Sequence, residues 1–131
     1  MSNMYNTTWK YVKPLQNKNA VADYLAKVGV ELPAPLVTLL TLYNGGRPSS
    51  KDFYTVDGHE AVFKSLLSYN ENDLETVYRI YPDVFQGTQL YPIGSDPAGN
   101  FICYDINQKN YTLWNHETNS TETIRSLPFD I

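Results

Sequence analysis

Two His-Glu dipeptides, His59-Glu60 and His116-Glu117, are the residues whose types most readily suggest metal or acid–base chemistry. A protein zinc site needs three or four ligands at characteristic spacing. Neither histidine has a second histidine four residues further on, and the chain contains only these two histidines. We therefore expect no bound metal, and we interpret both dipeptides as polar residues at turns and strand ends.

The single cysteine, Cys103, is a second candidate for chemistry, with His116 as its base. It lies inside the apolar run Phe101-Ile102-Cys103-Tyr104, where a thiol is usually buried, protonated and unreactive. One cysteine also excludes an internal disulfide and a cysteine-based zinc site. We interpret Cys103 as a small core residue.

The glycines and the paired carboxylates do not indicate a catalytic site either. Gly45-Gly46, Gly94 and Gly99 lack the spacing of a phosphate-binding loop, and no Lys-Ser/Thr pair follows them. Asp73 and Glu75 fit the start of a helix, where the helix dipole favours carboxylates, better than a glycosidase pair. We predict no catalytic residue, no cofactor and no metal, and therefore that the chain is not an enzyme.

The net charge of −4 is unevenly distributed. Residues 1–51 hold six Lys/Arg and two Asp/Glu, a net +4, whereas residues 52–131 hold four Lys/Arg and twelve Asp/Glu, a net −8. An acidic surface repels phosphate backbones, so nucleic acid is not expected as a direct partner. The asymmetry predicts a cationic protein partner, or else a solvated surface that keeps the protein soluble.

Residues 52–83 concentrate this negative charge, with seven carboxylates against Lys64 and Arg79. We predict that this acidic region contributes most of the partner-binding residues: Asp52, Asp57, Glu60, Glu71, Asp73, Glu75 and Asp83. The alternative, which the sequence leaves open, is that these residues only cap a helix and solvate a loop.

The length of 131 residues fits one domain, and 42% hydrophobic residues with 11 tyrosines indicate a packed core. No stretch approaches the roughly 18 apolar residues of a membrane span. Residues 1–13 lack the apolar run of a signal peptide. These observations predict a cytoplasmic protein without a membrane partner; the oligomeric state is left open.

Apolar spacing predicts three helices. In the first, Val21, Tyr24, Leu25 and Val28 share one face, with Asn17 or Asn19 as the cap and Gly29 after the end. The second begins near Pro35, buries Leu36, Leu39, Leu40 and Tyr43, and stops at Gly45-Gly46, one of which should have positive φ. The third is expected from Asn72 or Asp73, with Leu74, Val77, Tyr78 and Tyr81 on one face and Pro82 as its end.

Strands are expected at residues 53–56, 90–93, 101–105 and 111–114, where β-branched and aromatic residues alternate with turn signals. Residues 61–67 fit either a strand or a helix, and we favour a strand. Helices and strands do not alternate strictly, so a doubly wound sheet is disfavoured. The element order predicts an α+β fold, a single domain with a mixed or antiparallel sheet and helices packed beside it.

Four motifs occur in a characteristic order. They are Leu32-Pro33 with the helix end Asn44-Gly45-Gly46-Arg47-Pro48, then Leu90 to Asp96, Gly99 to Asp105, and Trp114 to Glu117. Together, over residues 20–117, they resemble the SUKH superfamily. Turn and core chemistry explain most of the motif residues, which we therefore interpret as structural: Leu32, Pro33, Asn44, Gly45, Gly46, Pro48, Gly94, Asp96, Gly99, Asn100, Asp105, Trp114, His116 and Glu117.

The resemblance implies one SUKH-like α+β domain over residues 1–131, without catalysis or cofactor. The superfamily includes bacterial immunity proteins and fungal Smi/Knr-type regulators of cell-wall glucan synthesis. We expect an immunity protein that neutralises a nuclease or deaminase toxin. The alternatives are a regulatory or scaffold module of the fungal type and, least favoured, a small hydrolase or deaminase. Residues 118–131 diverge from the family's terminal helix, since Pro128 would break it.

Overall fold

The computed structural model describes residues 7–131; residues 1–6, part of the segment examined above for a targeting signal, lie outside the described residues. Three helical segments and nine strands make up the described chain. In order they are β1 Trp9–Lys10, α1 Ala20–Val28, α2 Ala34–Leu42, β2 Arg47–Pro48, β3 Asp52–Thr55, β4 Glu60–Val62, β5 Ser65–Leu66, α3 Val77–Ile80 with its continuation η2 Tyr81–Phe85, β6 Leu90–Ser95, β7 Phe101–Asp105, β8 Asn110–Trp114 and β9 Thr121–Ser126. The predicted α+β class is confirmed.

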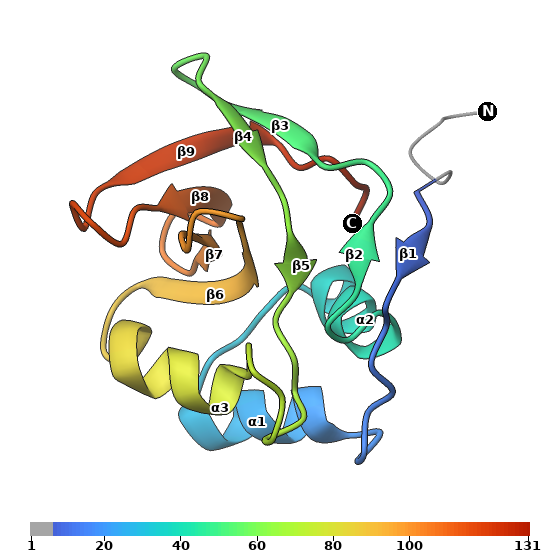
Figure 1. The fold of residues 1–131 in the computed structure, drawn as a ribbon. Coiled ribbons are helices and arrows are strands. Elements are labelled where there is room, and N and C mark those ends of the chain that lie inside the picture. Colours follow the sequence, from blue (N-terminus) through green and yellow to red (C-terminus); the bar gives the residue numbers. More distant parts are fainter. Residues whose placement is uncertain (1–6) are drawn as a thin grey trace.

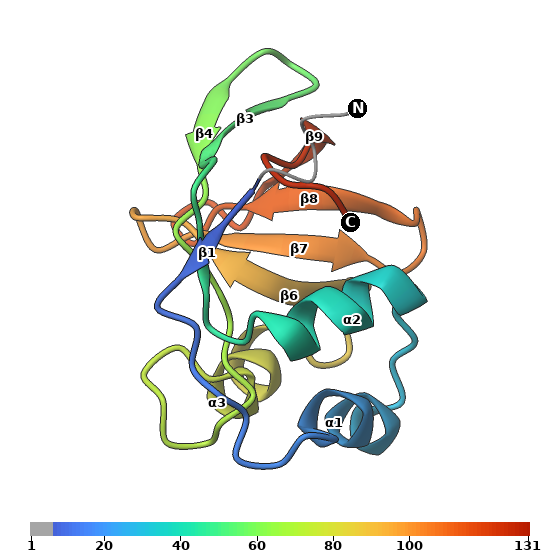
Figure 2. The same ribbon diagram turned by 90° about the vertical axis from the view of Figure 1, so that its right-hand side faces the viewer.

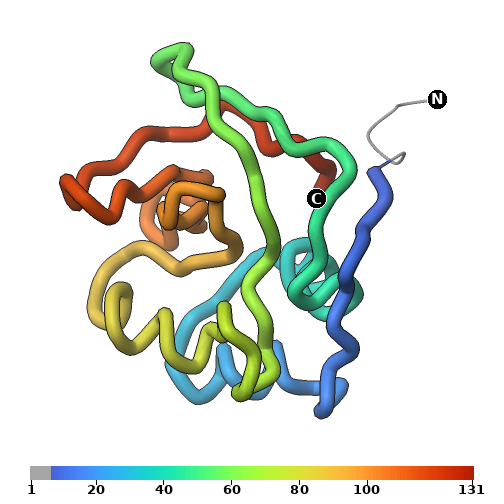
Figure 3. The backbone as a smooth tube through the Cα atoms, viewed as in Figure 1, coloured from blue at the N-terminus to red at the C-terminus, as the bar shows by residue number. Residues whose placement is uncertain are grey.

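Seven strands form one sheet in the order β4-β3-β9-β8-β7-β6-β5, and every neighbouring pair is antiparallel. The two end strands, β4 and β5, follow each other directly in the chain. Between them, the Phe63 N–H donates to the Lys51 carbonyl beside β3, and the Lys64 N–H donates to the Ser95 carbonyl of β6, both at 2.8 Å. One segment, residues 60–66, therefore joins both ends of the sheet and curls it into a barrel-like shape (Figures 1 and 3).

Phe63 fills the interior of the molecule where the sheet closes. Its side chain is fully buried and packs edge-on against Phe129, with ring centroids 5.0 Å apart. A Cβ atom on Gly94 of the neighbouring strand would overlap the Phe63 ring. Gly94 is thus required by close packing, because any side chain there would push Phe63 out of the closure.

The helices bury the faces that their apolar spacing predicted. The buried side chains include Val21, Tyr24 and Leu25 of α1 and Leu36, Leu39 and Leu40 of α2. Gly29 ends α1 at φ +73°, as expected, whereas Asn19 stands at the N-cap without a side-chain capping bond. Helices α1 and α3 lie at the opposite end of the molecule from the β3–β4 hairpin (Figure 2). No helix within residues 7–131 is long and apolar enough to cross a membrane.

The prediction for the third helix is wrong at both ends. It begins at Val77, not at Asn72 or Asp73, because the Thr76 hydroxyl caps it by accepting the Tyr78 N–H at 3.3 Å. Leu74, expected on its apolar face, lies in the preceding loop and is 86% exposed. The helix also continues past Pro82 to Phe85 as a π-helix. The wider π turn avoids the clash that proline makes with the carbonyl four residues earlier in an α-helix.

The strand predictions at 53–56, 90–93, 101–105 and 111–114 correspond to β3, β6, β7 and β8. The expected strand at 61–67 is divided into β4 and β5, because Phe63 and Lys64 form the passage from one end of the sheet to the other. Strand β9 was not predicted. It lies in the C-terminal stretch that we expected to diverge from the family, and this stretch contributes a central strand and the buried Phe129.

Gly45 gives a test of how α2 ends. Its φ is +67°, as predicted for one of the two glycines, and a Cβ there would lie 3.1 Å from the flexible Lys13 side chain. We expect Gly45→Val to lower the free energy of unfolding by about 1–2 kcal/mol through strain at positive φ. Gly45→Asn should cost less than about half of that, because asparagine tolerates this conformation. Urea denaturation of both variants measures this; equal losses would contradict it.

Candidate protein-binding surfaces

Asn44, the first residue of the helix-ending motif, is buried and uses its whole side chain on internal bonds. Its amide nitrogen donates to the Lys13 carbonyl at 2.9 Å and to the Ser68 hydroxyl at 3.1 Å. Its side-chain oxygen accepts the Tyr69 N–H at 2.7 Å, and its backbone carbonyl accepts the Lys13 N–H at 2.7 Å. Asn44 thus joins the N-terminal segment, the end of α2 and the chain after β5.

The Asp96 carboxylate shapes the turn between β6 and β7. It accepts the N–H groups of Ala98 and Asn100, at 3.0 and 2.7 Å. The Asn100 side-chain oxygen in turn accepts the backbone N–H of His116 at 3.1 Å. The ring Nδ1 of His116 lies 2.8 Å from the same oxygen. Two motifs far apart in sequence therefore meet at one turn, and their polar atoms bond to one another.

The other motif residues also lie at turns or against the core. The Asp105 carboxylate accepts the N–H groups of Asn107 and Gln108, and the indole N–H of Trp114 donates to Asn119 at 2.7 Å. Pro33 is the N-cap of α2, and Leu32 just before it is partly buried and packs against the hydrophobic core. Four members of this group are exposed, namely Pro33, Gly99, His116 and Glu117. The others are buried or half-buried: Leu32, Asn44, Gly45, Gly46, Pro48, Gly94, Asp96, Asn100, Asp105 and Trp114.

The candidate chemical groups do not gather in one place. Cys103 is buried, and desolvation, with a smaller contribution from Asp105, raises the pKa of its thiol well above the ordinary value. His59 and His116 lie on separate turns, paired with Glu122 and Asn100. Across residues 7–131 no three His, Cys, Asp or Glu side chains lie close enough together to hold a metal ion.

The seven predicted acidic residues occupy separate parts of the surface. Asp52, Asp57 and Glu60 lie on the β3–β4 hairpin. Glu71, Asp73 and Glu75 lie in the loop before α3, and Asp83 lies in η2. Figure 1 shows the hairpin and α3 at opposite ends of the molecule. The structure therefore places three of the seven on the hairpin and the other four near α3, and it does not bring all seven together.

Two of the loop carboxylates are used in internal bonds. Glu75 accepts the hydroxyls of Ser65 and Ser95, at 2.9 and 3.0 Å, and pairs with Lys64 at 3.1 Å. Asp73 accepts the Ser68 hydroxyl. Neither residue caps α3, since Thr76 does so; Glu75 instead fastens the loop to β5 and β6, and Asp73 bonds to the chain that follows β5.

The outward side of the β3–β4 hairpin combines acidic and apolar side chains. The cross-strand pairs Asp52–Val62 and Tyr54–Glu60 point away from the core, and Val56 continues the row. Tyr54, Val56 and Val62 are 45%, 54% and 40% exposed. We call this surface, consisting of Asp52, Tyr54, Val56, Asp57, Glu60 and Val62, the hairpin face. It contains three carboxylates and no lysine or arginine.

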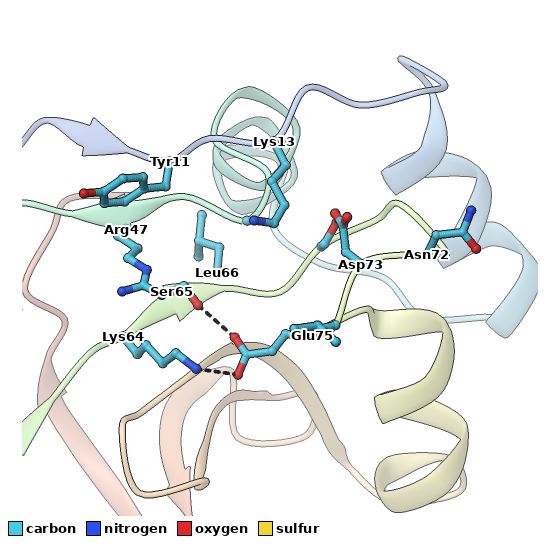
Figure 4. A pocket seen from close by; sticks show the side chains of 12 residues that line it. Tyr11, Lys13, Arg47, Lys64, Ser65, Leu66, Asn72, Asp73 and Glu75 are labelled. Atoms are coloured by element: carbon cyan, nitrogen blue, oxygen red, sulfur yellow. Dashed lines mark hydrogen bonds and ion pairs between the residues drawn. The ribbon is translucent and has the colours of Figure 1, made fainter.

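A cleft of about 560 Å³ lies on a different part of the molecule, between the N-terminal segment, the turn after α2, β5 and the loop before α3 (Figure 4). Its charged lining residues are Lys13, Arg47, Lys64, Asp73 and Glu75. Tyr11 and Leu74 also line it, and they are 71% and 86% exposed. Tyr11 and Arg47 are of residue types enriched at protein-binding surfaces, whereas the lysines and carboxylates beside them are of types depleted there.

Comparison with known families places the chain. The family described as SMI1-KNR4 cell-wall, a SUKH family, matches residues 19–126, which is most of the chain. The chain belongs to the SUKH superfamily. The resemblance based on the four motifs is thereby confirmed. No curated protein and no solved structure matches significantly.

Sequence reasoning about this SUKH domain missed several surface residues. The exposed apolar residues Tyr54, Val56 and Val62 lie in the predicted strands, and the alternation Asp52-Phe53-Tyr54-Thr55-Val56 already contained the signal for an outward row. Tyr11 and Leu74 had no such signal, because their positions depend on contacts between distant segments.

Asn44 provides a prediction about stability. Replacing it with alanine leaves the buried Tyr69 N–H without its partner and removes the bonds to Ser68 and to the Lys13 carbonyl, so the free energy of unfolding should fall by about 2–4 kcal/mol. Asn72→Ala, at an exposed position, should change it by less than about 0.5 kcal/mol. Chemical denaturation measures both, and similar small changes in the two variants would show that the network is not important.

His59 provides a prediction about pH. Its Nδ1 lies 2.6 Å from the Glu122 carboxylate, and this hydrogen bond, more than any other cause, raises the pKa of His59 above 6.5. Because the folded-state pKa is the higher one, the pair stabilises the fold at pH values below 6.5 and loses this effect as pH rises through the raised pKa. An NMR titration should place the His59 midpoint above 6.5, and Glu122→Gln should return it toward that value. An unchanged midpoint would contradict the assignment.

Proposed function

We propose that this SUKH domain is an immunity-type binding protein that neutralises a cationic toxin domain, of the nuclease or deaminase class, through its hairpin face. Membership in the family supports a non-catalytic domain. The observation that carries the proposal is the hairpin face itself, where three exposed apolar side chains alternate with three carboxylates.

The composition of the hairpin face suits such a partner. Tyrosine is enriched among the residues that contribute most binding energy, and Tyr54 is flanked by Val56 and by the carboxylate of Glu60. Nucleases and deaminases carry positive surfaces because their substrates are polyanions. Carboxylates on an inhibitor can cover such a surface and accelerate association through electrostatic steering.

A second candidate is a regulatory or scaffold module, which is supported by the cell-wall description of the matching family. The two candidates differ in the partner. An immunity role requires a toxin whose gene lies beside the gene for this chain, with a basic C-terminal domain. Neighbouring genes without any such toxin would favour the regulatory role.

The test uses charge reversal at two separate places with the same total change. We expect Asp52→Lys with Glu60→Lys to lower the association rate for the adjacent-gene toxin domain about fivefold or more at 50 mM salt, and much less at 500 mM salt. The matched control, Glu71→Lys with Asp83→Lys, should lower it less than about twofold. Neither pair of side chains forms an ion pair in the described structure.

Tyr54→Ala separates contact from steering. It should raise the dissociation rate about tenfold while leaving the association rate nearly unchanged, since it removes buried contact area and no charge. Surface plasmon resonance gives both rates, and circular dichroism checks the fold. If the two charge-reversal pairs have equal effects and Tyr54→Ala changes neither rate, the hairpin face is not part of the interface.

A further inference from the structure

The charges of the cleft are unequally used. Lys64 is paired with Glu75, and Asp73 accepts hydrogen bonds from Ser68 and Asn70. Lys13 and Arg47, by contrast, form no ion pair with any carboxylate among residues 7–131. Figure 4 shows both side chains among those that line the cleft. The charge that remains available to a ligand in the cleft is therefore positive. This is so even though most of the described surface carboxylates lie, like Asp73, in the C-terminal half of the sequence.

Arg47 is held in position before any ligand arrives. Its guanidinium carbon lies 5.6 Å from the centre of the Tyr11 ring, a cation–π distance, and its backbone pairs with Lys10. Tyr11 has a φ of +58°, which is unfavourable for a tyrosine. The pairing of Lys10 with β2 on one side and the Lys13–Asn44 bond on the other maintain this conformation. Such strain is retained where it orients a functional group.

Apolar side chains complete the cleft. Leu66 is buried and lines its inner part, while Leu74 stands almost fully exposed beside it. Helical packing does not explain Leu74, because it lies in the loop before α3. The volume of about 560 Å³ is within the range of sites that hold several side chains or a small ligand.

We propose that this cleft binds an acidic segment of a protein partner, with a carboxylate between Lys13 and Arg47 and a neighbouring apolar residue against Leu74. Three cationic and two anionic side chains line the cleft, so its net charge matches a single carboxylate better than a phosphate dianion. Planar carboxylates also match the fork of an arginine. The cleft shares no residue with the hairpin face, and it requires a ligand of the opposite charge.

The test is fluorescence anisotropy with a labelled octapeptide that contains one glutamate next to a leucine. We expect saturable binding below about 1 mM and no binding of the matched peptide with glutamine in place of that glutamate. Lys13→Gln with Arg47→Gln should weaken binding about tenfold or more, whereas Lys18→Gln with Lys27→Gln, the same charge change near α1, should leave it within about twofold. Leu74→Ser should weaken binding without altering its salt dependence.

Three outcomes would overturn the proposal. The glutamate and glutamine peptides bind equally, or neither binds, or the Lys13 and Arg47 variant binds as the wild type does while its melting temperature is unchanged. Arg47→Lys guards against a folding defect, because it keeps the charge and loses only the planar fork. Tighter binding of a phosphoserine peptide than of the glutamate peptide is a fourth outcome that would overturn the proposal, because it would show that the cleft prefers a dianion. None of these results depends on the hairpin face.

Discussion

The carboxamide of Asn44 holds together the N-terminal segment, the end of α2 and the chain after β5, at a point where these three stretches do not pair with one another as strands. It bonds to the backbone at Lys13 and Tyr69 and to the Ser68 hydroxyl, and through Ser68 it reaches the loop carboxylate of Asp73. A buried amide with all its bonds made is specific in direction, unlike an apolar contact. The cleft lies between these stretches, so its shape depends on a buried group that does not line it.

Local patterns predicted much of the fold, because helices α1 and α2 and strands β3, β6, β7 and β8 each carry their own periodicity. The third helix shows where this information ends. Leu74 fits the apolar spacing of a helix as well as Val77 does. The Thr76 hydroxyl caps the helix between them, however, so Val77 begins the helix and Leu74 remains in the loop. Strand β9 has polar residues at most positions, and only its place between β3 and β8 makes it a strand.

The candidate surfaces were less predictable than the fold. Charge counting selected Asp52, Asp57 and Glu60 as candidates together with Glu75, whose carboxylate the structure shows to be occupied by Ser65, Ser95 and Lys64. A sequence shows which side chains carry charge and not which charges already have partners. The cleft could not be predicted from the sequence for a related reason. Its residues come from four separate segments that only the folded chain brings together.

The closure of the sheet through residues 60–66 also limits how other chains can attach. A long open edge strand offers unpaired backbone groups to any extended peptide, and it is a common route to aggregation. Here the end strands are three and two residues long, and the Leu66 N–H is already bonded to the Gly46 carbonyl at 2.9 Å. With so little edge available for strand addition, the sheet offers few backbone groups to another chain, which gives the protein some protection from edge-to-edge self-association.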